Sequence, residues 1–267
     1  MTSLTPSSLN AVHVHIRTVR ADGLGVITLA RPDKKNALNK QTAIELVASL
    51  RELESAADVR VVIVEGDGDD FCTGADLAAL ESTLDAGADA HIEDARALGR
   101  VFQTMREMSK PIVAIVRGRA LGGGAGLATA CDIVLAEASA QFGYPEVRLG
   151  FVPAMVMTML RRAVGEKRAA ELVLTGRIIG AEEAERIGLI SRCIPTHAFP
   201  SEVAKAIDAL VNTPGTAIGL TKRLLYRLDD LDFAQSIGVG VATNVESRAT
   251  DDFRAGVRRF LDRSRSA

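Results

Sequence analysis

Short apolar runs of strand length alternate with helical patterns until about residue 195, and this alternation constrains the fold most. Three runs have the unbroken apolar character of buried strands: VRVVIVEG (59–66), PIVAIVRG (111–118) and DIVLA (132–136). Helical patterns lie near residues 40–56, 92–108 and 124–130. Such alternation is typical of an α/β architecture, and the order of the elements predicts stacked ββα units.

The region after residue 200 differs, because only helical patterns remain there, for example Leu220, Leu224, Leu225 and Leu228. We therefore predict an α/β core at 11–200 followed by a helical C-terminal region at 201–267. The first ten residues carry no pattern and are predicted to form a flexible tail (1–10). No segment rich enough in proline or glycine to be a long linker separates the two regions.

The first two strands are predicted to form a hairpin. Apolar and polar residues alternate over 12–18, a second apolar run covers 26–29, and Asp22-Gly23 between them is a turn signal. We expect Asn39 to cap the helix that follows. The predicted buried face of that helix recurs every three residues: Ile44, Val47, Leu50 and Leu53.

Composition and charge exclude several classes of protein. Of the 267 residues 47% are hydrophobic and 25% are charged, which is ordinary for a globular chain and excludes disorder and coiled coil. The net charge of −2 gives no general attraction to a polyanion, so we expect no nucleic-acid partner. We find no secretory leader and no membrane-spanning apolar run, and the three cysteines are scattered. We therefore expect a cytoplasmic protein without a membrane partner.

Nucleotide and metal motifs are missing from the sequence. No P-loop occurs, the glycines at 122–126 fail the dinucleotide fingerprint, and none of the four histidines stands in a zinc-binding spacing. His13 and His15 share one face of the first strand and are interpreted as a polar strand face. We therefore expect no metal site.

Residues 65–95 carry ten acidic residues and neither lysine nor arginine. This composition predicts a solvated, mobile surface stretch that binds phosphate poorly. Cations for an anionic ligand would have to come from Arg31, Lys34 and Lys35, or from the arginine-rich C-terminus.

A glycine-rich loop, Leu121-Gly-Gly-Gly-Ala-Gly126, joins a predicted strand to a short apolar helix. Glycines let a ligand approach the backbone closely, and the N–H groups at a helix start suit an oxygen that gains negative charge. A tight packing turn would explain the same residues. A second strand-to-helix junction, Cys72 to Leu77, could supply another N–H donor. Glu146 after Pro145, taken alone, is typical of a surface turn.

These segments together resemble the enoyl-CoA hydratase/isomerase (crotonase) family. The resemblance is carried by RPDKKNALN, FCTGADL, GRALGGGAGLATACDIVLA, AQFGYPEVRLGFVP and ELVLTGRIIGAEEAERIGLI, in this order, and extends from about residue 12 to the C-terminus. It implies an α/β, crotonase-like spiral of ββα repeats with a C-terminal helical oligomerisation region. It also implies a homotrimer or hexamer (a dimer of trimers). The implied substrate is an acyl-CoA thioester, with no cofactor beyond coenzyme A as part of that substrate.

The resemblance also implies site residues. The backbone N–H groups of Ala75 and Gly123 would hold the thioester oxygen, and Glu146 would be the catalytic acid/base. Coenzyme A would contact residues of the two loops and one residue of the last helix: Lys34, Lys35, Ala37, Leu38, Asp76 and Phe260.

The sequence departs from the family's two-glutamate hydratases at one position. The first glutamate of that pair is replaced by Gly126, whereas the second is kept as Glu146. We expect hydration of an enoyl-CoA with Glu146 as the single acid/base. A Δ3–Δ2 isomerase, an acyl-CoA decarboxylase and a non-catalytic acyl-CoA-binding protein remain alternatives.

A second departure lies downstream, where residues 153–157 read PAMVM in place of a glycine-rich stretch. The methionines could reshape the acyl pocket or simply pack in the core. The PEVRLG pattern is similar to bacterial hydratases of branched enoyl-CoAs. If Glu146 and Arg148 lay on an extended strand they would share a face, and Arg148 could then hold a substrate carboxylate. A surface arginine paired with a nearby acid is the favoured interpretation.

Overall fold

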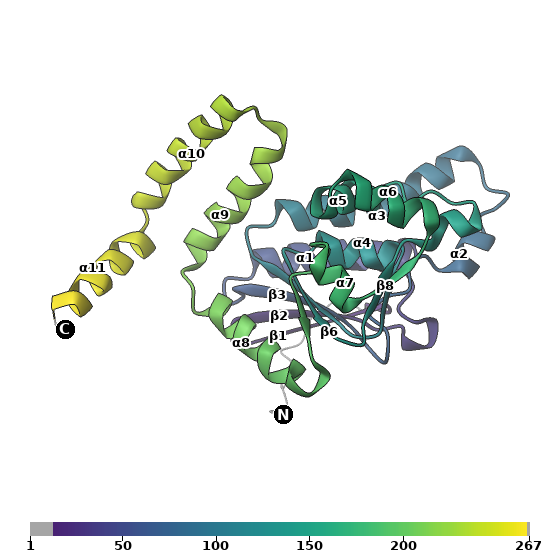
Figure 1. The fold of residues 1–267 in the computed structure, drawn as a ribbon, viewed down its shortest axis with the longest axis horizontal. Coiled ribbons are helices and arrows are strands. Elements are labelled where there is room, and N and C mark those ends of the chain that lie inside the picture. The colour runs from purple at the N-terminus through teal and green to yellow at the C-terminus, as the bar shows by residue number, and fades with distance from the viewer. Residues whose placement is uncertain (1–12, 266–267) are drawn as a thin grey trace.

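The computed structural model describes residues 13–265, so the predicted tail (1–10) lies outside the described residues. Its centre is a six-stranded sheet, shown with its helices in Figure 1. The strands follow the order β1 (Ile16–Ala21), β2 (Leu24–Leu29), β3 (Val61–Gly66), β4 (Ile112–Val116), β6 (Ile133–Glu137) and β9 (Arg192–Ile194). β1 and β2 are antiparallel, and every later pair is parallel.

The predicted hairpin is confirmed. β1 and β2 are joined by Asp22 and Gly23, whose φ angles are 52° and 82°, and the two strands pair from Ile16–Leu29 to Ala21–Leu24. Positive φ at two successive turn residues matches the right-handed twist of the flanking strands, which is why Asp-Gly favours this turn.

A second, smaller sheet crosses the molecule beside the first and contains β5 (Arg119–Leu121), β7 (Gln141–Gly143) and β8 (Ile178–Gly180). Two isolated parallel bridges, Cys72 with Ala120 and Leu38 with Ala75, extend it by two short segments. Successive chain segments thus add one strand to the large sheet, one segment to the small sheet and then a helix. The predicted spiral of ββα units is confirmed.

Helices cover the two sheets, and after β9 the described part of the chain forms only helices. The core helices are α1 (Lys40–Ser55), α2 (Leu77–Glu81), α3 (Ala88–Glu107), α4 (Gly123–Ala130), α5 (Val156–Val164), α6 (Glu166–Thr175) and α7 (Ala181–Arg186). The C-terminal helices are α8 (Phe199–Val211), α9 (Gly215–Arg227), α10 (Phe233–Arg248) and α11 (Asp251–Arg265). Short 3-10 helices are η1 (Pro32–Lys34), η2 (Pro145–Leu149), η3 (Thr196–Ala198) and η4 (Leu228–Asp230).

The unbroken apolar runs are explained by burial on both faces of the large sheet. In β3, Val62 and Val64 join the main core, whereas Val61 and Ile63 pack in a second core with α8. Alternate residues of a strand face opposite sides, so a sheet covered on both sides needs an apolar residue at every position.

Helix α1 begins where predicted, but its buried face differs in part from the predicted one. The Asn39 side chain accepts a hydrogen bond from the Thr42 N–H at 2.9 Å. Of the four predicted positions Leu50 and Leu53 are buried and Val47 packs partly buried against the core, but Ile44 is 49% exposed, and Ala43 and Leu46 are buried as well. A spacing of three drifts around a helix of 3.6 residues per turn, so the four predicted residues do not share one face.

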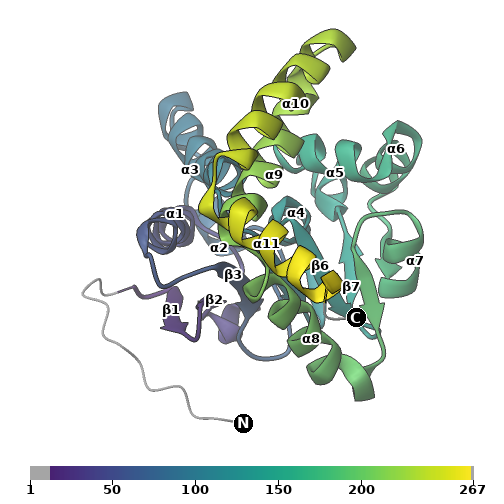
Figure 2. The same ribbon diagram turned by 90° about the vertical axis from the view of Figure 1, so that its left-hand side faces the viewer.

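The last helices project from the core. Figure 1 shows α9, α10 and α11 extending away from the two sheets, and Figure 2 shows the same helices from the side. Exposed apolar residues follow one side of α10 at intervals of four: Phe233, Ile237, Val241 and Val245. Within residues 13–265, no helix has both the length and the apolar character needed to cross a membrane.

Candidate active site

Four segments of the chain end at the same edge of the small sheet. The bridges of Leu38 with Ala75 and of Cys72 with Ala120 are parallel, and so is the pairing of β5 with β7. Parallel segments present their carboxyl ends at one edge, which is where open α/β sheets bind ligands. The loops that carry Ala75, Gly123 and Glu146 therefore converge there.

Close backbone packing fixes the first two of these loops against each other. The Cys72 N–H donates to the Arg119 carbonyl at 3.0 Å, and the Leu121 N–H donates to the Cys72 carbonyl at 2.9 Å. A Cβ on Gly124 would lie only 2.2 Å from the Cys72 carbonyl oxygen. A Cβ on Gly74, whose φ is 97°, would lie 2.9 Å from the Leu121 carbonyl oxygen. Glycine is required here because no side chain fits between the loops.

Two backbone N–H groups are left open at this junction. Gly123 is the first residue of α4, so its N–H has no partner inside the helix. The bridge between Ala75 and Leu38 uses backbone groups on either side of Ala75: the Leu38 N–H donates to the Gly74 carbonyl, and the Asp76 N–H donates to the Leu38 carbonyl. Among the described residues neither the Ala75 nor the Gly123 N–H has an acceptor. The positive end of the α4 dipole adds to the field at Gly123.

Glu146 faces this pair from the next segment of the small sheet. It lies in η2, directly after β7, and its Oε1 is 2.9 Å from where a Cβ on Gly122 would stand. Its Oε2 is buried and has no hydrogen-bond partner among the described residues. Burial raises the pKa of the Glu146 carboxyl above its ordinary value. A half-buried carboxyl with an orphan oxygen is well suited to exchange protons with a ligand.

Two neighbouring side chains fix the loop that carries Glu146. Tyr144 is fully buried, and its hydroxyl lies 3.0 Å from Thr129 Oγ1 on α4. Thr129 in turn donates to the Ala125 carbonyl at 2.7 Å. This chain of contacts ties the start of η2 to the helix whose first N–H faces the site.

Gly126 lies one turn further along α4 and has no room for a side chain. A Cβ there would stand 2.1 Å from Val156 Cγ1 and 2.8 Å from Val156 Cβ. The first carboxylate of a two-glutamate site is therefore absent, and Val156 fills the space beside its backbone position. Nothing in the sequence could reveal this contact, because thirty residues separate Gly126 from Val156.

The predicted coenzyme A contacts fall into exposed and buried groups. Lys34 and Lys35 are exposed at the end of η1, whereas Ala37 and Leu38 are each 7% exposed. Leu38 reaches the site, since its Cδ1 would lie 3.5 Å from a Cβ on Gly123.

Asp76 is 8% exposed, and its carboxylate accepts from Arg31 at 2.7 Å and caps α2 through the Ala79 N–H. The hydrogen bond from Arg31 lowers the pKa of Asp76. Asp70 is also buried, and it pairs with Arg119. The prediction of a solvated stretch at 65–95 is therefore wrong for these two acids. The Arg31–Asp76 pair joins two loops of the site, but no local pattern indicates it.

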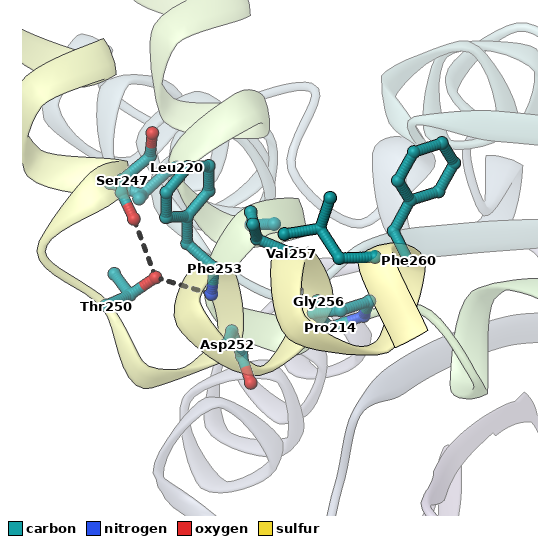
Figure 3. A pocket seen from close by; sticks show the side chains of 11 residues that line it. Pro214, Leu220, Ser247, Thr250, Asp252, Phe253, Gly256, Val257 and Phe260 are labelled. Atoms are coloured by element: carbon teal, nitrogen blue, oxygen red, sulfur yellow. Dashed lines mark hydrogen bonds between the residues drawn. The ribbon is translucent and has the colours of Figure 1, made fainter. Parts of the chain in front are cut away.

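Phe260 lies apart from the four loops. It is 73% exposed on α11, and it borders an apolar cavity of about 420 Å³ between α9 and α11. Figure 3 shows Leu220, Phe253 and Val257 around this cavity. Figure 1 shows α11, the helix that carries Phe260, apart from the two sheets.

The structural premise for Arg148 as a carboxylate ligand is wrong. Residues 145–149 form the 3-10 helix η2 and not an extended strand. With about three residues per turn, side chains two apart point in different directions. Arg148 is exposed, and its Nε lies 3.1 Å from where a Cβ on Gly176 would stand, at the end of α6.

Comparisons with known proteins agree with this geometry. A family model described as enoyl-CoA hydratase/isomerase matches residues 20–267. A Thermus thermophilus protein named "Putative enoyl-CoA hydratase" is 38% identical over 240 residues, which cover 90% of this chain and 95% of that protein. The crotonyl-CoA hydratase of Syntrophomonas wolfei is 32% identical, over 92% of this chain and 95% of its own length.

Solved structures show the same fold. The structure of an enoyl-CoA hydratase from Mycobacterium smegmatis has a TM-score of 0.89 at 26% identity, and covers 93% of this chain and 96% of its own. The family model spans most of the chain, and the relatives match over nearly their full length. The chain is therefore an enzyme of the enoyl-CoA hydratase/isomerase family.

Proposed function

We propose that this enzyme is an acyl-CoA lyase that adds water to an enoyl-CoA thioester. One observation carries the proposal. The buried, unpartnered Oε2 of Glu146 stands beside the same glycine junction that leaves the Ala75 and Gly123 N–H groups open. The names of the relatives, which include a crotonyl-CoA hydratase, support hydration as the reaction.

The two N–H groups would bind the thioester oxygen. As water attacks Cβ, electrons move toward the carbonyl and the oxygen gains negative charge. Donors fixed in advance stabilise that charge without reorganising, and each is worth about 3 kcal/mol in comparable sites. The backbone bonds of Cys72 and Leu121 hold the two loops in place, so Ala75 and Gly123 need no movement to act together.

Glu146 would carry the protons in both directions. The water oxygen forms the bond to Cβ, and one water proton passes to the Glu146 carboxylate. A proton from Glu146 then reaches Cα, so the net change is addition of one water across the double bond. Burial raises the pKa of the Glu146 carboxyl, which makes its ionised form a stronger base than an exposed glutamate.

We propose that the coenzyme A portion lies along the two loops beside η1. Lys34 and Lys35 are exposed there and supply positive charge for its phosphates. Ala37 and Leu38 would contact the nucleotide through backbone and apolar surface, and Asp76 would act by orienting Arg31. Coenzyme A would enter only as part of the substrate, with no further cofactor.

Double-bond isomerisation is the second candidate, favoured by the contact between Gly126 and Val156. A water held in a protein site usually makes about three hydrogen bonds. With a glycine at 126 and a valine against it, α4 adds no second carboxylate beside Glu146. A single base can still move a proton from Cα to Cγ of a 3-enoyl-CoA.

The products of a substrate panel distinguish the two reactions. The purified enzyme is incubated with straight 2-enoyl-, 3-enoyl- and 3-methylglutaconyl-CoA, and the products are analysed by mass. Hydration adds the mass of water, whereas isomerisation adds nothing. In Glu146→Gln we expect kcat to fall by about 10²–10⁴ with acyl-CoA affinity retained. Glu107→Gln, at an exposed glutamate of α3, is the matched control.

Two results would contradict the proposed function. Full hydration by Glu146→Gln would remove Glu146 from the reaction. Binding of acyl-CoA without hydration of any enoyl-CoA would indicate a non-catalytic protein or, if carbon dioxide is released from a carboxyacyl-CoA, a decarboxylase.

We also propose a homo-oligomer, either a trimer or a dimer of trimers. The apolar side of α10 leaves Phe233 84% and Val245 63% exposed, which a partner chain would cover. In such an assembly Phe260 could approach coenzyme A bound to a neighbouring chain. Sedimentation of the wild type and of Ile237→Ser/Val241→Ser tests this, and a monomeric wild type would refute it.

A further inference from the structure

The wall beside Glu146 is built from three helices. Gly123 and Gly126 are three residues apart on α4 and therefore share one face of that helix. Without side chains, this face lets α3 and α5 come close to the backbone. The helix that supplies one thioester-binding N–H thus also supplies part of the surface that the acyl chain must follow.

The wall becomes more buried from Gly123 toward Gly126. Leu98 is half-buried, and its Cδ2 would lie 4.0 Å from a Cβ on Gly123. One turn further, Val156 and Phe102 are 3% and 8% exposed. Both of them face the notch at Gly126, where a Cβ would stand 2.1 Å from Val156 Cγ1 and 3.6 Å from Phe102 Cζ.

Met155 closes the space between α3 and α5. Its Sδ would lie 3.8 Å from a Cβ on Gly99, one residue beyond Leu98. The side chains nearest to Gly123 and Gly126 are all apolar, namely Leu38, Leu98, Phe102 and Val156, and so is Met155, which precedes Val156 in the chain. Among the described residues that form this wall, none offers a charge or a side-chain hydrogen bond to an acyl group.

We propose that Val156 is a specificity-determining residue that selects a compact, apolar acyl group without a second carboxylate. Its Cγ1 methyl and Cβ occupy the notch at Gly126, one turn of α4 beyond the N–H of Gly123. In this proposal they limit the space open to an acyl chain beyond the thioester-binding N–H groups. The inference rests on the proposed binding of the thioester oxygen by Ala75 and Gly123, but it does not depend on which reaction follows.

Saturated acyl-CoAs test the inference, because they bind but cannot be hydrated. Affinities for butanoyl-, 3-methylbutanoyl- and glutaryl-CoA are measured by calorimetry. We expect the wild type to bind butanoyl-CoA at least tenfold more tightly than glutaryl-CoA, since a carboxylate gains no partner at the wall. Val156→Ala should raise the affinity for 3-methylbutanoyl-CoA relative to that for butanoyl-CoA by about tenfold, and Val156→Ile should lower this affinity ratio.

Val164→Ala is the matched control. Val164 is a buried valine of the same helix, two turns beyond Val156, and 9% exposed. It should lower the melting temperature without changing the affinity ratio. Because Val156→Ile keeps every atom of the valine, the test does not rely on the alanine variant alone.

Three outcomes overturn the inference. The first is equal wild-type affinity for glutaryl-CoA and butanoyl-CoA. The other two concern the affinity for 3-methylbutanoyl-CoA relative to butanoyl-CoA: the same ratio in Val156→Ala and Val164→Ala, or a ratio in Val156→Ile that equals that of the wild type. Failure of the proposed function is distinct. If the wild type binds these ligands with the expected ratios but hydrates no enoyl-CoA, hydration fails and the role of Val156 stands.

Discussion

The active-site edge and the C-terminal helices both leave groups without partners, but the groups are of opposite kinds. At the edge they are polar, namely two N–H groups and the Oε2 of Glu146. On α10 they are apolar, with Ile237 55% and Val241 60% exposed. Fixed polar groups suit a small ligand whose charge changes during reaction. A row of apolar side chains suits a second protein surface.

Glycine shows the same difference between the two regions. Gly124 and Gly126 on α4 are surrounded so closely that a Cβ would lie within 2.2 Å of a neighbouring atom. Gly238 and Gly240 on α10 have nothing within 4 Å of such a Cβ. The glycines of the edge are therefore required by packing inside the chain. Those of α10 are not, so any constraint on them must come from outside it.

An alanine at each kind of glycine gives the largest expected contrast. Gly124→Ala places a methyl group against the Cys72 carbonyl, so the two loops must separate. We expect a loss of about 5 kcal/mol or more of stability, or no folding, together with loss of activity. Gly240→Ala should instead stabilise the isolated helix by about 1 kcal/mol. Urea unfolding of both variants checks this.

Two results would break the comparison. A folded, active Gly124→Ala enzyme would show that the loops are not fixed by that contact. A Gly240→Ala variant that dissociates to a smaller species, although its helix is favoured, would show that a partner backbone approaches α10 closely.

A buried ion pair attaches the C-terminal helices to the core, and its removal should have the next largest effect. Lys222 of α9 is 6% exposed, and its Nζ donates to Asp132 at 2.7 Å and to the Lys110 carbonyl at 3.0 Å. Lys222→Met leaves the Asp132 carboxylate with its charge uncompensated, which costs about 3 kcal/mol. We expect a lower melting temperature and looser attachment of α9, read by hydrogen exchange.

The control for this variant is Lys205→Met on α8. Lys205 pairs with Glu202 at 2.7 Å, but its side chain is 72% exposed, so the pair is screened by solvent and its loss should cost far less stability. Equal losses of stability in the two variants would mean that burial of Lys222 does not strengthen the attachment of α9 to the core.

The sequence predicted what depends on local pattern. The hairpin, the cap at Asn39 and the strands of the core all follow from spacing within a few residues. Predictions that needed distant contacts failed or could not be made. One local hypothesis also failed: a shared strand face for Glu146 and Arg148 required an extended segment, but PEVRL forms a 3-10 helix. The favoured interpretation of Arg148 as a surface residue agrees with its exposure.

The packing of Val156 on Gly126 and the pairing of Arg31 with Asp76 join residues 30 and 45 positions apart. Spacing cannot reveal such contacts, because they exist only after the sheets have formed. The motifs located the site, whereas its inner surface depends on the three-dimensional fold.

The smallest expected effect compares the half-buried Glu146 with the buried Glu45. Burial raises the pKa of Glu146, which has an orphan oxygen. At Glu45 burial acts in the same direction, but hydrogen bonds from Gln41 and from the N–H groups of His15 and Val14 outweigh it and lower the pKa. When the pKa is higher in the folded state than in the unfolded state, stability falls as pH rises from the unfolded-state pKa to the folded-state pKa. When the folded-state pKa is lower, stability falls as pH drops between the two values.

Glu146→Gln should therefore gain about 0.5–2 kcal/mol of stability at pH 7, and the gain should shrink toward pH 4, where the wild-type carboxyl is protonated. Glu45→Gln should lose stability at pH 7, because Val14, His15 and Ile16 donate to the ionised carboxylate. Urea unfolding from pH 4 to pH 8 measures both. A loss of stability in Glu146→Gln at every pH would mean that its carboxylate is paired within the chain, and that the edge is not held open for a substrate.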